Sequence, residues 1–235
     1  MSTPPAPEPD TATLIRIRLN LDNDDIRRNV HRPNSLHKTV MLLAPEGLGD
    51  TPRQKAGILF RLEHATHTTP PTLLVQSQMP PDLTRLPAAY GTAETRDLTP
   101  LLAALTTGRR VRYRITANPS IRRTVKDGTD PFFPGVKPRH TDVPLHGDDA
   151  LAWWQRKATR AGLDLHSAAL TPLPRSRHPI RKEHDDRPSG EFRYALRRFD
   201  GEATITDPDQ LRNAVLAGIG RGKAYGAGML SLAPA

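Results

Sequence analysis

The stretch DPDQLRNAVLAGIGRGKAYGAGMLSLAP, residues 207–234, places a helix, a glycine-rich loop and a strand in that order. Asp207 followed by Pro208 is typical of a helix N-terminus, because the aspartate oxygen accepts hydrogen bonds from the first backbone N–H groups. Gly218 predicts the end of this helix, and GMLSLAP (228–234) predicts the final strand. The order of these elements limits what the loop can bind.

The glycine-rich loop, residues 218–228, matches neither of two common nucleotide-binding motifs. A Walker A motif needs glycine where this chain has Ala217, and serine or threonine where it has Ala224. A Rossmann motif needs a third glycine where Lys223 stands. Both motifs run from a strand to a helix, so that the helix N-terminus faces the phosphate, whereas this loop runs from a helix to a strand. An ATPase or a dehydrogenase is therefore disfavoured.

Two interpretations of the glycine-rich loop remain open from the residues alone. In one, the glycines only supply the positive φ angles of a turn. In the other, they let a nucleic-acid backbone approach closely, with Arg221 and Lys223 as cations. The composition favours a polyanionic partner, because 34 Lys and Arg against 25 Asp and Glu give a net charge of +9.

Upstream of this stretch, two segments alternate apolar and cationic residues, which is typical of strands with one buried face. TLIRIRLNL (13–21) directs its isoleucines and leucines to one face and Arg16 and Arg18 to the other. RRVRYRITANP (109–119) has the same pattern, with Arg114 on the cationic face. We further predict strands at 57–64 and 72–78 and helices at 32–45, with Ser35 as its N-cap, and at 96–108, so the first half reads β-α-β-β-α-β.

The second half is predicted to repeat this order, with a strand at 141–145, a helix at 147–162, a strand at 165–174, a hairpin at 191–206, and the final helix and strand. This is the order of the ferredoxin-like fold. We therefore predict an α+β protein with two tandem ferredoxin-like (RRM-like, βαββαβ) domains. The predicted divisions are a disordered proline-rich tail (1–12), an N-terminal domain (13–120), a linker (121–140), and a C-terminal domain (141–235) with a basic insertion (175–190) and the glycine-rich loop (218–228).

Several classes of protein are excluded or disfavoured by composition. The chain has no cysteine, so disulfides, thiol catalysis and cysteine-based zinc sites are excluded. His64 and His67 form an H-x-x-H pair without further ligands, so we expect no metal site and no cofactor. No apolar run is long enough to span a membrane, and the first residues lack a secretory signal. We expect a cytoplasmic protein without a membrane partner.

Three segments carry a resemblance to a known family. GIGRGKAYGAGMLSLAP (218–234) is similar to the signature G-x-G-x-x-K-x-x-G-x-G-L-L-S-L-A-P, with Met229 as a conservative departure. YRITANPSIR (113–122) is similar to an F-R-L-R-A-N-P stretch, with Thr116 in place of an arginine, and SLHKTV (35–40) resembles an L/M-H-x-x-L/V helix. These motifs resemble those of the CasE-type CRISPR repeat-RNA endoribonucleases of type I-E systems, in the RAMP superfamily.

The resemblance implies an activity and partners. Such enzymes cut the CRISPR precursor transcript within each repeat, at the 3′ base of a stem-loop, without a metal. The ribose 2′-OH attacks the adjacent phosphate and leaves a 2′,3′-cyclic phosphate. The enzyme then stays bound to the crRNA with other CRISPR-associated subunits of the surveillance complex.

His37 is the candidate catalytic residue, because the family's L/M-H-x-x-L/V helix carries the catalytic histidine at this position. Histidine is suited to proton transfer because its pKa lies near neutrality. From the pattern alone, His37 could also be a partly buried structural histidine. Family members often carry a tyrosine three residues earlier, where this chain has Asn34. Tyr225 is the residue that we consider in its place, and Lys38 is a further supporting candidate as a cation for the transition state.

Basic residues and the glycine-rich loop are the candidate RNA-binding groups. The charged insertion at 175–190 resembles the basic hairpin with which the family holds its RNA stem, and it also fits a solvated loop. Aromatic residues are only 5% of the chain, so recognition of a hairpin by shape is favoured over base stacking. The candidate RNA-binding residues are Arg16, Arg18, Arg114, Arg175, Arg177, Arg181, Lys182, Gly220, Arg221 and Lys223.

Two alternative functions remain open. One is a catalytically inactive subunit that binds the RNA hairpin in the same complex, since Asn34 cannot supply a titrating proton. The other is a general RNA-binding module, which would show no preference for a repeat hairpin.

Overall fold

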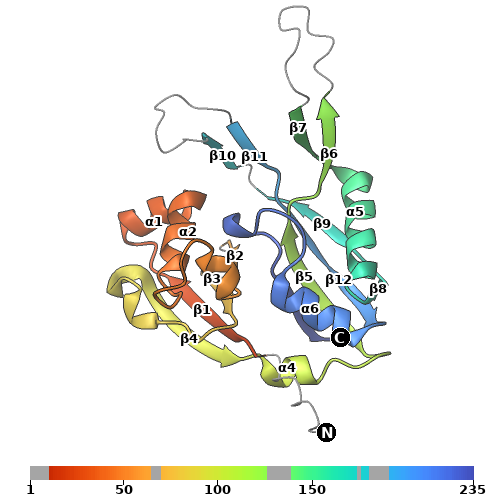
Figure 1. The fold of residues 1–235 in the computed structure, drawn as a ribbon, viewed down its shortest axis with the longest axis horizontal. Coiled ribbons are helices and arrows are strands. Elements are labelled where there is room, and N and C mark those ends of the chain that lie inside the picture. Colours follow the sequence, from red (N-terminus) through yellow and green to blue (C-terminus); the bar gives the residue numbers. More distant parts are fainter. Residues whose placement is uncertain (1–10, 65–69, 126–138, 174–175, 180–190) are drawn as a thin grey trace, which may run out of the picture.

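The computed structural model describes residues 11–64, 70–125, 139–173, 176–179 and 191–235. Two units lie side by side in Figure 1, one drawn in red to yellow and the other in green to blue, and each has its own sheet. The predicted disordered tail (1–12) lies almost wholly outside the described residues.

The first unit is an antiparallel sheet with strand order β2-β3-β1-β4, the order of a ferredoxin-like sheet. Helices cover one of its faces, and the two short 3₁₀ turns η1 and η2 stand where the second helix of the fold is expected. Its elements are β1 (Thr13–Leu19), α1 (Asp24–Val30), α2 (Pro33–Met41), α3 (Pro52–Lys55), β2 (Leu59–Glu63), β3 (Thr72–Ser77), η1 (Leu83–Arg85), η2 (Ala88–Tyr90) and β4 (Gly91–Asp97).

The second unit has strand order β13-β5-β12-β8, again that of a ferredoxin-like sheet, and β9 also pairs with β12. Short helix α4 (Thr99–Ala103) leads into it. Its elements are β5 (Arg110–Ala117), α5 (Gly147–Arg160), β8 (Leu163–Leu165), β9 (Ala169–Pro172), β12 (Arg197–Ile205), α6 (Pro208–Ala217) and β13 (Leu230–Pro234). The prediction of two ferredoxin-like domains is therefore confirmed.

Two hairpins project from the second unit (Figure 1). One pairs β6 (Ser120–Val125) with β7 (Arg139–Pro144), and the other pairs β10 (Ser176–Pro179) with β11 (Glu191–Tyr194). The first hairpin lies largely in the predicted linker, and the second lies at the predicted basic insertion. Segment 141–145, predicted as the first strand of the C-terminal domain, is therefore part of the β6–β7 hairpin.

The strand at 109–119 forms as predicted, but its assignment to the N-terminal domain (13–120) is wrong. Strand β5 pairs with β12 and β13, and Tyr113 packs against Trp154 of α5, so this strand is the first of the second unit. The fourth strand of the first sheet is instead β4, which pairs with β1. The helix predicted at 96–108 is helical only over Thr99–Ala103.

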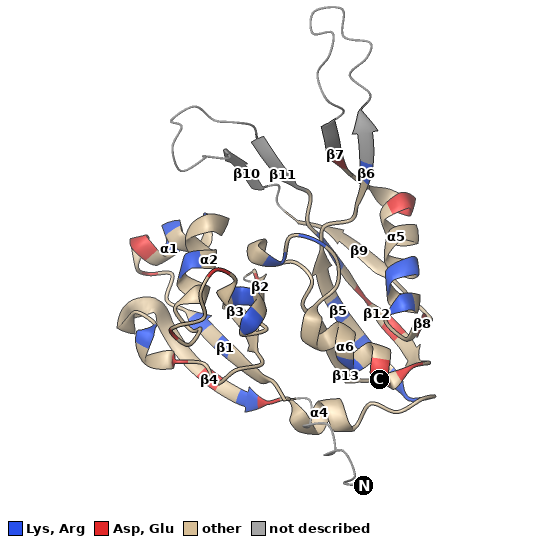
Figure 2. Cartoon of the chain, viewed as in Figure 1, with Lys and Arg blue, Asp and Glu red and all other residues tan. Residues whose placement is uncertain are grey.

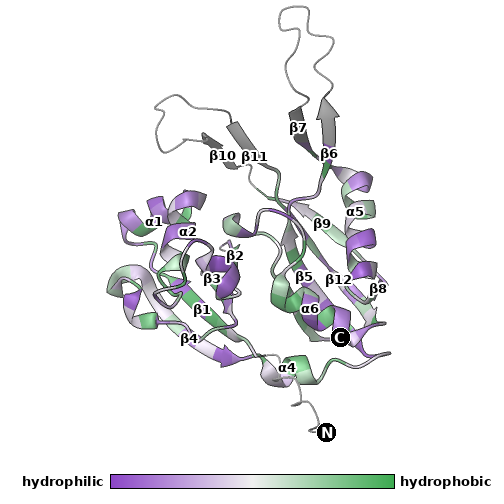
Figure 3. Cartoon of the chain, viewed as in Figure 1, coloured by the Kyte–Doolittle hydropathy of each residue, from purple (hydrophilic) through white to green (hydrophobic). Residues whose placement is uncertain are grey.

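Each unit has its own apolar core. Ile15, Ile17 and Leu19 of β1 are buried under α1 and α2, as the alternation of the strand predicted. The core of the second unit is built around Trp154 and Phe199, which stack at 5.6 Å. Green and purple alternate along α5 in Figure 3, which fits a helix with one buried face.

The outer face of the first sheet packs against the second unit through buried polar groups. The amide of Gln76 donates to the Val215 carbonyl at 2.9 Å, and that of Gln78 donates to the Leu216 carbonyl at 3.0 Å. The Arg61 guanidinium, 2% exposed, donates to the Met229 and Arg114 carbonyls and to the Glu63 carboxylate. These contacts fix β2 and β3 relative to α6 and the residue before β13.

Candidate active site

His37 lies on α2 at the junction of the two units. Helix α2 begins at Pro33 with Arg32 as its N-cap residue, so the predicted cap at Ser35 is wrong; proline is favoured at the first helical position. Leu36 and Val40 are buried beneath the helix, which leaves the intervening His37 partly exposed. Its ring stacks on that of Phe60 in β2, with centroids 6.4 Å apart.

The environment of His37 favours its neutral form. Burial lowers the pKa of the imidazole below its ordinary value of 6.5, and the positive charge of Arg53 lowers it further. The Nδ1 atom is buried and has no hydrogen-bond partner among the described residues. A neutral imidazole at pH 7 can accept a proton from a substrate that approaches the exposed side of the ring.

A network of polar side chains holds α2 in place. Asn29 of α1 donates to the Thr39 hydroxyl at 3.0 Å and accepts from the Tyr90 hydroxyl at 3.0 Å. Burial raises the pKa of Tyr90 to about 12, so this hydroxyl stays protonated near neutral pH. The network therefore links α1, α2 and η2 and fixes the helix that carries His37.

The glycine-rich loop reaches across the junction to α2 and β2 through a short 3₁₀ turn, η4 (Lys223–Tyr225). Gly222 and Gly226, which flank this turn, both have left-handed backbone angles that favour glycine. A β-carbon built at Gly226 would lie 3.4 Å from the Phe60 ring. The loop thus places Lys223 close to the strand whose Phe60 also supports His37.

Several amides of the glycine-rich loop are already used within the protein. Ile219 N donates to the Gly228 carbonyl at 2.9 Å, and Gly228 N donates to the Thr116 carbonyl at 2.7 Å. Tyr225 N and Ala227 N both donate to the Gly222 carbonyl. These amides are used in the protein's own structure, so they are not free to bind a ligand.

Replacing Gly228 with alanine is expected to destabilise the fold by about 1–3 kcal/mol, because a side chain is strained at its φ of +91° and its β-carbon would lie 2.8 Å from the Ile219 carbonyl oxygen. Urea denaturation measures the effect. Gly108→Ala is the matched control, since Gly108 has a φ of +83° and nothing within 4 Å of the added carbon. Equal losses in the two variants would contradict a role for the contact with Ile219.

Most of the predicted cations that the structure describes already face carboxylates. Arg16 and Arg18, on the outer face of the first sheet, share Glu94. Arg114 pairs with Asp200 and Glu63, and Arg221 pairs with Asp142 of β7. None of these four arginines is among the causes of the lowered pKa of His37, which are burial and the charge of Arg53.

The structure describes only some of the remaining predicted site residues. Lys38 is exposed in the last turn of α2, and a β-carbon built at Gly220 would lie 3.3 Å from the Trp153 ring. Tyr225 is partly buried in η4. Arg175, Arg181 and Lys182 lie outside the described residues, and only the backbone of Arg177 is described, in β10.

Arg53 is a residue of this site that the sequence did not indicate. It lies in α3, is partly buried, and lowers the pKa of both His37 and Lys223 through its charge. Burial is the larger cause of the lowered pKa of Lys223. Figure 2 shows the basic residues of α2, α3 and the glycine-rich loop where the two units meet.

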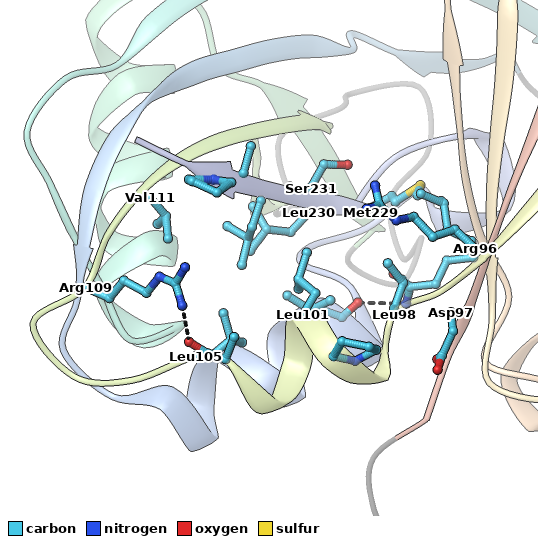
Figure 4. A pocket seen from close by; sticks show the side chains of 18 residues that line it. Arg96, Asp97, Leu98, Leu101, Leu105, Arg109, Val111, Met229, Leu230 and Ser231 are labelled. Atoms are coloured by element: carbon cyan, nitrogen blue, oxygen red, sulfur yellow. Dashed lines mark hydrogen bonds between the residues drawn. The ribbon is translucent and has the colours of Figure 1, made fainter.

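A cavity of about 480 Å³ lies away from His37, between α4, α6 and β13. Leu101, Leu105 and Leu230 line it, with Arg96 and Arg109 also at its wall (Figure 4). Within the described ranges, no three histidine or acidic side chains come together as metal ligands, and no helix there has the length and apolarity to cross a membrane.

The fold and the site define a protein of two ferredoxin-like units with a histidine and basic side chains at their junction. A family model described as CRISPR associated protein matches residues 14–234. The chain therefore belongs to this family of CRISPR-associated proteins.

Individual relatives match along almost the whole chain. The CRISPR-associated endoribonuclease Cse3 of Thermus thermophilus is 28% identical over 226 residues, which cover 94% of this chain and 99% of Cse3. A structure of CRISPR endoribonuclease Cse3 bound to 19-nucleotide RNA has a TM-score of 0.72 at 24% identity and covers 95% of this chain and 100% of that chain. A chain of a CRISPR RNA-guided surveillance complex in a pre-nicking state is 35% identical, with a TM-score of 0.65, and covers 95% of this chain and 100% of that chain.

Proposed function

We propose that this chain is a metal-independent endoribonuclease that cuts CRISPR precursor RNA within its repeats, at the 3′ base of a stem-loop. It remains bound to the mature crRNA as a subunit of a surveillance complex. The observation that carries the proposal is the partly buried, neutral His37 beside the cations Arg53 and Lys223, in a chain of this family. The RNA-bound structure of Cse3 and the related surveillance-complex chain support it.

The proposed reaction is a transesterification. The ribose 2′-oxygen bonds to the adjacent phosphorus as the bond from phosphorus to the 5′-oxygen breaks, which gives a 2′,3′-cyclic phosphate and a 5′-hydroxyl. One proton leaves the 2′-hydroxyl and one reaches the 5′-oxygen, and His37 carries one of these transfers. Lys223 and Arg53 stabilise the extra negative charge on the phosphorane.

Incubation with RNA from the repeat that neighbours its gene tests the proposal. In EDTA, we expect one cut at the 3′ base of the stem, with a 2′,3′-cyclic phosphate on the upstream product. A 2′-deoxy substitution at the nucleotide before the cut removes the nucleophile, so it should block cleavage while binding stays within several-fold. Electrophoresis, end analysis and filter binding measure the three quantities.

A repeat RNA whose stem strands are mismatched is the matched control substrate, and we expect it to be bound more weakly and left uncut. Cleavage of the 2′-deoxy RNA would contradict the transesterification. Wild-type protein that binds the hairpin tightly but leaves it intact would instead support the alternative of an inactive hairpin-binding subunit, which Asn34 in place of the family's tyrosine favours.

A further inference from the structure

The basic groups around His37 are Arg53 and Lys223. Unlike the arginines described above, they have no carboxylate partner among the described residues. The pKa of Arg53 is lowered by burial, and that of Lys223 by burial and then by Arg53. In the described part of the chain, neither side chain forms an ion pair, and no acidic group contributes to their pKa values or to that of His37. A partly buried positive cluster of this kind is stabilised by binding an anion.

Local contacts fix Arg53 at the edge of the site. Its Nη1 atom donates to the Ile58 carbonyl at 3.2 Å, which ties α3 to the residue just before β2. Phe60, two residues further along, stacks on the His37 ring and lies against Gly226 of the glycine-rich loop. Arg53, His37 and Lys223 therefore approach one region from three different elements, namely α3, α2 and η4.

We infer that Arg53 is a catalytic residue that contacts the scissile phosphate, and that it forms with Lys223 a two-cation clamp beside His37. This inference rests on the proposed function and assigns to the same site a group that the sequence motifs do not contain. The planar guanidinium can donate two parallel hydrogen bonds to phosphate oxygens. Because Nη1 already donates to the Ile58 carbonyl, the remaining N–H groups of the Arg53 guanidinium are the ones that donate to the substrate phosphate.

The position of Arg53 gives it two effects on the reaction. It supplies positive charge where negative charge develops on the phosphorane. It also lowers the pKa of His37, which keeps the imidazole unprotonated and able to accept a proton near neutral pH. The bound phosphate would partly offset the repulsion between Arg53, Lys223 and a protonated His37 after the transfer.

Arg53→Gln tests the inference, with Lys55→Gln as the matched control because Lys55 is an exposed cation on the same short helix. We expect Arg53→Gln to lower the single-turnover cleavage rate by about 100-fold, as for loss of one transition-state donor, with the Kd for repeat RNA within about five-fold. Arg53→Lys, which keeps the charge, should recover part of the rate. Lys55→Gln should match the wild type in rate and Kd.

The pH dependence separates this role from a purely structural one. Removing a positive charge favours the imidazolium, so the pKa of His37 followed by NMR should rise in Arg53→Gln, while it stays low in Arg53→Lys and Lys55→Gln. An unchanged rate and an unchanged His37 pKa in Arg53→Gln would overturn the inference while the proposed function stands.

If the wild type cuts no RNA, the proposed function is refuted. A phosphate titration still tests the role of Arg53 in that case. We expect inorganic phosphate to shift the His37 imidazole resonances of the wild type and of Lys55→Gln at lower concentrations than those of Arg53→Gln. Equal responses in all three proteins would overturn the assignment of Arg53 to an anion site.

Discussion

Replacing His37 with alanine is expected to lower the single-turnover rate of repeat-RNA cleavage by about 10²–10⁴-fold, the usual contribution of general acid–base catalysis. The Kd for the hairpin should stay within several-fold, because the phosphate clamp and the other basic surfaces remain. The reason is chemical: of the three side chains that meet at this site, the imidazole is the one whose ordinary pKa lies near neutrality, and burial and the charge of Arg53 lower that pKa. Quench-flow or manual sampling with excess enzyme measures the rate.

Two further variants make the result at His37 interpretable. His37→Gln keeps a polar side chain over Phe60 but cannot transfer a proton near pH 7, so it should be as slow as the alanine variant. His166→Ala is the matched control, because His166 bonds the Thr204 hydroxyl on the exposed side of the second unit. Cleavage by His37→Ala at the wild-type rate would show that another group performs the proton transfer.

The sequence predicted the elements with strong local signals. Asp207 accepts hydrogen bonds from the amides of Asp209 and Gln210 at the start of α6, and the helix ends at Ala217 before Gly218, as the cap and glycine signals indicated. The alternation correctly predicted the buried side chains Ile15 and Ile17 of β1 and Val111, Tyr113 and Ile115 of β5, but Thr116, on the predicted polar face of β5, is buried too. Periodicity of this kind depends on the strand itself and needs no knowledge of its partners.

Sheet membership could not be read in the same way. An alternating strand fits either sheet, so the pattern alone groups β5 with the unit that precedes it, whereas its apolar face packs on Trp154 of α5. The sequence pattern does not predict strand β4, because this exposed edge strand, GTAETRD, has little apolar alternation. A strand that pairs on one side and faces solvent needs few hydrophobic residues.

The sequence predicts only part of the candidate site, because some of its residues come together only through tertiary contacts. His37 has a motif, but Arg53 stands in the polar segment TPRQKAG, which reads as a loop. Its role depends on α3 folding back onto Ile58 and on a loop from the other unit bringing Lys223 near. Likewise, Arg16 and Arg18 look like free cations in the sequence, and only the pairing of β1 with β4 reveals Glu94 beside them.

The second large effect is expected from Arg61→Met, which should lower the free energy of unfolding by about 3 kcal/mol. Arg61 is 2% exposed, and its guanidinium joins the first sheet to the Arg114 and Met229 carbonyls of the second. Methionine fills a similar volume but cannot donate to the two carbonyls, and it removes one cationic partner of Glu63. Urea denaturation followed by circular dichroism measures the loss.

Arg16→Met is the matched control for Arg61→Met, because Arg16 lies on the same face of the same sheet and also pairs with a glutamate. Its side chain is 50% exposed, so water can replace the ion pair and the expected loss is only about 0–1 kcal/mol. A loss for Arg61→Met no larger than that for Arg16→Met would contradict the role of the buried guanidinium. Since Arg61 is bonded to Met229, which follows the glycine-rich loop, we also expect Arg61→Met to slow RNA cleavage, because His37 and Lys223 would no longer be held together.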